Sequence, residues 1–115
     1  MSEPSVLQSL SALIRERKLN PTRERSYVAS LLNAGVEKIG SKILEEAREV
    51  VEAARESGEE GREHLVKEVA DLMFHSLVAL GFHNLDWSAV EAELVRRSGI
   101  SGIEEKESRT PKIDP

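Results

Sequence analysis

The stretch that decides the fold covers residues 62–82 and reads REHLVKEVADLMFHSLVALGF. When it is wound as a helix at about 100° per residue, apolar side chains cover most of its circumference. One narrow polar stripe runs through them, formed by Glu68, Asp71 and His75. Because a helix that is apolar nearly all round is normally buried, we expect a buried helix that carries these polar groups into the interior.

The rest of the chain is also rich in helix-forming residues and predicts an all-α fold. Aromatic residues make up only 3% of it, and no segment shows the sustained alternation of a strand. Residues 58–61, GEEG, are the expected exposed loop between the two longest helices. Ser5 with Gln8, and Ser88 with Glu91, have the spacing of capping boxes. About five helices are expected, over residues 6–18, 25–33, 36–56 and 62–82, with a fifth from Ser88 to about Arg97.

The length of 115 residues suits a single domain. We expect the core of this domain over about residues 5–109 and a frayed tail over residues 110–115. A helical chain of this size buries only a modest core by itself, and such chains often complete the core across a symmetric interface. A homo-oligomer is therefore expected.

Charge and composition exclude several classes of protein. The formal net charge of −5 argues against nucleic acid or an anionic membrane as the main partner. The absence of cysteine excludes disulfide scaffolds, thiolate zinc sites and thiol catalysis. No apolar run approaches the roughly 18 residues of a membrane helix, and the first residues lack the features of a signal peptide. We therefore expect a cytoplasmic protein.

Acidic residues are paired at helical spacing on two of the expected helices. Glu46 and Glu49 are three residues apart on one, and Glu68 and Asp71 are three apart on the next. If these helices pack antiparallel, four carboxylates converge and repel one another. Hard divalent cations with oxygen ligands, Mg²⁺ first, relieve that repulsion and also bind phosphates. The pattern predicts a cation site between the two helices.

Other interpretations of the same residues stay open. A solvated helix face accounts for Glu45 and Glu49, and only Glu46 lies at the edge of the apolar arc. The acids of the 62–82 helix have a structural alternative, an ion pair with Arg48 or with an arginine elsewhere. His75 is interpreted as a hydrogen-bonded histidine of the core or behind the ligands, because acidic Mg²⁺ sites rarely need imidazole.

These motifs occur together in one known family. The chain resembles the phosphoribosyl-ATP pyrophosphohydrolases, which belong to the MazG-like superfamily of all-α nucleoside triphosphate pyrophosphohydrolases. The resemblance covers most of residues 23–109, and one departure is Leu44, where many relatives have glycine before the Glu pair. The matching segments are SYVASLL (26–32), GVEKI (35–39), KILEEAREVV (42–51), EVADLMFH (68–75) and RRSGISGIEEK (96–106).

The resemblance implies Mg²⁺-dependent hydrolysis of phosphoribosyl-ATP to phosphoribosyl-AMP and pyrophosphate, the second step of histidine biosynthesis, with Mn²⁺ as a possible substitute. It also implies a homodimer in which paired long helices form a four-helix bundle, with one site per subunit near the interface. Glu45 would be a spare ligand or, with Glu49, a catalytic carboxylate that orients the attacking water. The implied metal ligands are Glu46, Glu49, Glu68 and Asp71.

Phosphate binding should also need basic side chains, since acids at a metal site repel the substrate. Lys38 and Lys42 lie one turn apart just before the acids, although solvated lysines paired with Glu45 or Glu49 explain them equally well. Tyr27 is either a stacking platform for a base or ribose, or a core residue with its hydroxyl at the surface. Position in the family adds Arg23 and Arg97 as substrate-binding candidates.

Two other functions remain alternatives. One is a house-cleaning pyrophosphohydrolase that acts on (d)NTPs, and the other is a non-catalytic helical dimerisation module. Many relatives are fused to a cyclohydrolase that uses cysteine-bound zinc, and we expect the stand-alone form here because the chain has no cysteine. Any association with that enzyme of the next step would be a loose one between separate chains.

Overall fold

The computed structural model describes residues 3–20 and 26–98, and every regular element in these ranges is an α-helix. The expected all-α fold with five helices is therefore confirmed. The elements are α1 (Val6–Leu19), α2 (Tyr27–Ala34), α3 (Val36–Ala54), α4 (Gly58–Phe82) and α5 (Trp87–Arg97). The expected tail over residues 110–115 lies outside the described residues.

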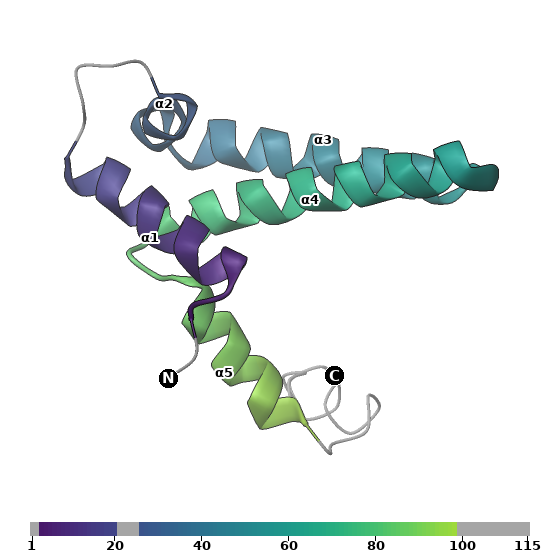
Figure 1. The fold of residues 1–115 in the computed structure, drawn as a ribbon. Helices are drawn as coiled ribbons and strands as arrows, with labels where there is room; N and C mark the ends of the chain where they lie inside the picture. The colour runs from purple at the N-terminus through teal and green to yellow at the C-terminus, as the bar shows by residue number, and fades with distance from the viewer. Residues whose placement is uncertain (1–2, 21–25, 99–115) are drawn as a thin grey trace, which may run out of the picture.

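Helices α3 and α4 form a long antiparallel hairpin, and the contact between them is the most extensive in the described chain (Figure 1). Helix α1 packs against α4, and α2 lies across the start of α3. Helix α5 leads away from the hairpin and contacts α1. The core lies where α1, α2, the start of α3 and the end of α4 meet, and it is built from Ile14, Val28, Leu31, Ile39, Leu77 and Val78.

The N-terminal caps explain where α1 and α2 begin. The predicted capping box is confirmed, because the Ser5 hydroxyl accepts from the Gln8 amide at 3.2 Å and the Ser5 amide donates to the Gln8 side chain at 3.1 Å. In α2 the Ser26 hydroxyl accepts from the Ala29 amide at 3.2 Å. The predicted start of α2 at Arg25 is thus too early, since Ser26 already has the extended backbone of a cap.

The segment 58–61 is not a loop, contrary to the expectation from its two glycines. Helix α4 begins at Gly58, and α3 ends at Ala54 rather than at Glu56. A Cβ on Gly61 would lie only 3.0 Å from the carbonyl carbon of Glu56. Gly61 therefore belongs to the first turns of α4, where it lets the turn after α3 approach the helix closely.

The cap of α5 also differs from the prediction. Asp86, not Ser88, is the N-cap, and its carboxylate accepts from the Ser88 amide at 3.1 Å. Glu91 instead accepts a hydrogen bond from the Gln8 side chain at 3.0 Å, which joins α5 to α1. An acidic cap is favourable here because the helix dipole places positive potential at the N-terminus.

The expectation that α4 is buried nearly all round is wrong for a single chain. Its C-terminal half packs under α1, but Val66 is 69% exposed and Val69 is also exposed. On α3, Leu44 and Val51 are exposed in the same way. These four residues define the open apolar face of the hairpin. None of the described helices is long and apolar enough to cross a membrane.

Candidate metal centre

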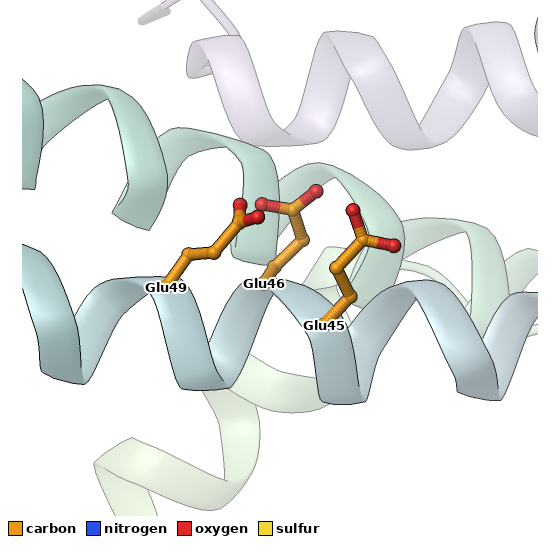
Figure 2. Close-up of side chains that lie close together, drawn as sticks. All are labelled: Glu45, Glu46 and Glu49. Carbon is orange, nitrogen blue, oxygen red and sulfur yellow. The ribbon is translucent and has the colours of Figure 1, made fainter.

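The acids of α3 extend to one side of the helix, with Glu46 between Glu45 and Glu49 (Figure 2). One carboxylate oxygen from each of the three lies within 4.8 Å of the others. Glu46 also belongs to a second group of the same size, with Glu68 and Asp71 of α4. Glu46, Glu68 and Asp71 thus converge across the hairpin as predicted, whereas Glu49 is grouped with Glu45 and Glu46 on α3.

Burial separates Glu46 from its neighbours. Glu46 is only 6% exposed, whereas the side chain of Glu45 is exposed. The solvated-face interpretation thus suits Glu45, whose side chain is 42% exposed, while Glu46, expected at the edge of the apolar arc, is buried. A carboxylate in that position needs a proton or a cation, because burying an unpaired charge is costly.

Two oxygens of the cluster lack the partners that buried polar atoms normally have. Within the described residues, Oε1 of Glu46 and Oε1 of Glu68 are buried without a hydrogen-bond partner. The alternative of a structural ion pair with Arg48 is not what forms, since Arg48 lies 4.0 Å from Glu52. The unpartnered oxygens instead indicate a place for a cation.

The ionisation of the cluster follows from crowding of like charges. Burial is the main cause that raises the pKa of Glu46 from 4.5 to about 7, and the adjoining carboxylates of Glu68, Asp71 and Glu49 add to it. Close approach of Glu68 and partial burial also raise the pKa of Glu49. Burial disfavours the charged form of Glu68, but its contacts with Glu49, Glu46 and His64 outweigh burial and lower its pKa. Without a cation, the cluster therefore favours protonation of Glu46 and ionisation of Glu68.

The donor set fits a hard divalent cation. It consists of carboxylate oxygens from two helices, and two of those oxygens are buried and unpartnered. Mg²⁺ and Mn²⁺ prefer oxygen ligands, whereas softer metals would need sulfur or imidazole. A bound cation would supply the charge that this cluster lacks.

His75 and Tyr27 form a pair beside the acids. His75 is buried, its Nδ1 lies 3.0 Å from the Asp71 carbonyl oxygen, and its Nε2 lies 2.8 Å from the Tyr27 hydroxyl. Because a carbonyl only accepts, Nδ1 donates. The interpretation of His75 as a hydrogen-bonded histidine of the core is confirmed. Of the two alternatives for Tyr27, a core residue does not fit, because Tyr27 is 51% exposed while its hydroxyl contacts His75.

The basic residues are placed less uniformly. Lys42 Nζ lies 3.4 Å from Glu45 Oε1, and this contact raises the pKa of Lys42. Lys38 is exposed one turn earlier on α3. Arg97 ends α5, and its Nε lies 3.0 Å from Glu93 Oε2. Helix α5 leads away from the α3–α4 hairpin that carries the acidic cluster (Figure 1), so one chain does not bring Arg97 to the cluster. Arg23 lies outside the described residues.

Sequence reasoning missed two residues of this region, His64 and Glu56. His64 Nε2 lies 3.1 Å from Glu68 Oε2, and Nδ1 lies 3.1 Å from both oxygens of Glu56. Hydrogen bonding to Glu56 raises the pKa of His64 against its partial burial. The four-residue spacing of His64 and Glu68 on one helix was the available signal. Nothing in the sequence places Glu56 opposite His64.

The fold and the acidic cluster define the class of protein: an all-α protein whose long hairpin brings carboxylates from both of its helices together. The family model described as phosphoribosyl-ATP pyrophosphohydrolase matches residues 7–98. The chain belongs to the phosphoribosyl-ATP pyrophosphohydrolase family.

Curated relatives are similar in sequence to this chain over most of their length. A phosphoribosyl-ATP pyrophosphatase of Geobacter metallireducens is 49% identical over 104 residues, which is 90% of this chain and 92% of the relative. The protein of the same name from Geotalea daltonii is 48% identical over 104 residues, 90% of this chain and 94% of the relative. That of Rhodopirellula baltica is 47% identical over 91 residues, 79% of this chain and 76% of the relative.

Proposed function

We propose that the protein hydrolyses phosphoribosyl-ATP to phosphoribosyl-AMP and pyrophosphate with Mg²⁺ as cofactor, as the second step of histidine biosynthesis. Family membership supports the substrate. The observation that carries the chemistry is the pair of buried, unpartnered oxygens on Glu46 and Glu68, which lie in one cluster with Asp71. Mn²⁺ has the same ligand preference and should substitute.

The proposed ligands are Glu46, Glu49, Glu68 and Asp71. Bound Mg²⁺ would offset the charge of the triphosphate and the charge that develops as the bond between the α and β phosphates breaks. Glu45, with Glu49, accepts a hydrogen bond from the attacking water and takes up its proton. Glu45 suits this role because its side chain is 42% exposed, so that solvent can reach its carboxylate beside the buried Glu46.

The substrate contacts are proposed from place and charge. Lys42, which contacts Glu45, and Lys38, one turn earlier, would bind phosphate oxygens. The ring of Tyr27 is half-exposed and is held by its hydroxyl, so it offers a face to the base or ribose. Arg23 is proposed from its family position. A role for Arg97 requires a second subunit, because α5 leads away from the hairpin in one chain.

We also propose a homodimer formed through the open apolar face. Leu44 and Val51 are seven residues apart on α3, and Val66 and Val69 are three apart on α4, so each pair lies on one face of its helix. Pairing two hairpins would cover this face and form the four-helix bundle. Three further properties remain predictions. They are a single domain over residues 1–115, a location in the cytoplasm, and a loose association with a separate cyclohydrolase.

Pyrophosphate release from phosphoribosyl-ATP tests the proposal. With Mg²⁺ or Mn²⁺ the purified protein should release pyrophosphate, and removing the metal with EDTA should abolish release. Glu68→Gln should lower kcat about 100-fold or more, because it removes a charged ligand. Glu63→Gln, which changes an exposed acid of the same helix, should leave kcat unchanged.

The alternatives give different outcomes in the same assay. A clear preference for a dNTP over phosphoribosyl-ATP would establish the house-cleaning activity instead. A non-catalytic dimerisation module would release no pyrophosphate with either metal, and Mg²⁺ would not raise its melting temperature. Under the proposed function Mg²⁺ binds only the folded protein and raises that temperature by mass action.

A further inference from the structure

His64 has no part in the proposed chemistry, yet it contacts one of the proposed ligands. Its Nε2 lies 3.1 Å from Oε2 of Glu68, and its Nδ1 lies 3.1 Å from both carboxylate oxygens of Glu56. The imidazole ring therefore connects the turn that follows α3 with an acid that points into the cluster. Its side chain is 40% exposed, whereas that of Glu68 is 14% exposed.

The two oxygens of Glu68 have different surroundings. Oε2 faces the imidazole of His64, while Oε1 is buried and has no hydrogen-bond partner within the described ranges 3–20 and 26–98. The contact with His64 thus occupies one oxygen and leaves the other to the group formed with Glu46 and Asp71. It also restricts the rotation of a side chain that would otherwise lose rotamer entropy on binding a ligand.

The other end of the connection is held by the backbone. The Glu56 amide donates to the Ala53 carbonyl at 3.1 Å, which keeps the turn against the end of α3. Gly61 lets the same turn approach α4, since a Cβ there would lie 3.0 Å from the Glu56 Cβ. Glu56 is therefore placed opposite His64 by close packing between the turn and the helix.

We propose that His64 is a positioning residue, which is held by Glu56 and in turn holds the Glu68 carboxylate with Oε1 free to bind a divalent cation. The inference rests on the proposed function, because it concerns the same cation site. Groups that hydrogen-bond to metal ligands commonly account for a 10- to 100-fold difference in metal affinity, since they fix the orientation of the ligand before binding.

Titration of the metal-free full-length protein with Mg²⁺ alone, followed by calorimetry, tests this role without reference to activity. His64→Ala should raise the Kd for Mg²⁺ about tenfold. Glu56→Ala should raise it less, because the histidine remains. In the double variant the Glu56 change should add nothing to the effect of His64→Ala, since Glu56 acts only through the histidine.

The matched control is Arg62→Ala, which removes a positive charge from an exposed position about 200° away around the same helix. It should leave the Kd within twofold of wild type. His64→Gln, which keeps one N–H for Glu68, should restore part of the affinity. Melting temperatures of the metal-free variants should stay close to wild type, because His64 is part-exposed.

Two results would overturn the positioning role. One is a Kd for His64→Ala within twofold of wild type, and the other is an equal loss of affinity in Arg62→Ala, which would show that the loss does not depend on the contact between His64 and Glu68. If wild type itself binds no Mg²⁺, the proposed cation site is wrong and the role of His64 is wrong with it. If wild type binds Mg²⁺ and His64→Ala binds it equally well, only the role of His64 is wrong.

Discussion

At the scale of single residues, the protein concentrates unfavourable charge at Glu46. This carboxylate is buried, belongs to both groups of acids and has its pKa raised to about 7, chiefly by burial. Above pH 7 without a cation it must ionise in a site that opposes its charge. The buried negative charge that destabilises the metal-free protein is also what would bind a divalent cation.

This cost predicts how the stability of the metal-free protein depends on pH. Between pH 4.5 and 7 the unfolded chain releases the Glu46 proton while the folded chain keeps it, so the free energy of unfolding falls as pH rises. The loss, on the order of 3 kcal/mol, should be complete about one pH unit above the folded-state pKa of about 7. Thermal unfolding in EDTA from pH 5 to 8 measures it, and Glu46→Gln should remove most of the slope.

Glu52→Gln is the control for that experiment, since Glu52 is an exposed acid of the same helix paired with Arg48. It should retain the wild-type slope. Adding Mg²⁺ should restore the stability of wild type at pH 8 but not that of Glu46→Gln. If the stability of wild type and of Glu46→Gln changed with pH in the same way, the destabilising effect assigned to this carboxylate would be wrong.

At the scale of elements, glycines decide how closely helices pack. A Cβ on Gly81 would lie 2.5 Å from Cγ2 of Ile14, a fully buried residue of α1. Gly40, in the interior of α3, has no neighbour within 4 Å of such a Cβ. The first glycine therefore permits the contact of α1 with α4, whereas the second only lowers helix propensity.

The two glycines predict opposite effects of one substitution. Gly81→Ala should destabilise the protein by about 1–3 kcal/mol, because Ile14 has no room to move. Gly40→Ala should stabilise it by about 0.5–1 kcal/mol through helix propensity alone. Urea unfolding measures both, and a stabilising Gly81→Ala would show that α1 is not packed as described.

At the scale of the whole molecule, one chain leaves an apolar face open along its longest helices. Leu44 is 72% exposed and Val66 is 69% exposed, in a chain whose buried core lies at one end of the hairpin. Exposed apolar surface that runs along two helices is typical of an interface. The hairpin is thus half of the proposed bundle.

Light scattering at micromolar concentration should give twice the chain mass of 12.8 kDa. Val66→Asp should shift the protein toward monomer and lower its melting temperature in a concentration-dependent way, because it buries like charges across the interface. Val6→Asp, at an equally exposed valine on α1, should remain dimeric. A wild-type monomer would contradict the proposed bundle.

Much of this architecture was predictable because local patterns act on local structure. The helical period of the apolar residues, the Ser5–Gln8 box and the three-residue spacing of the acids depend on neighbours in sequence. The start of α4 was not predictable, because two glycines in four residues are typical of a loop. Only the close packing of the turn at Glu56 against Gly61 shows why glycine is needed inside the helix.

The sequence by itself determined the all-α fold, the family and the five acids, because helix period and motif spacing are properties of the chain alone. Only the tertiary structure decided that Glu46 is the buried acid, that the Tyr27 hydroxyl contacts His75 and that the His64 ring contacts the Glu68 carboxylate. These outcomes depend on how closely α3, α4 and their connecting turn approach one another, and such distances are set by packing between segments that the sequence pattern treats separately.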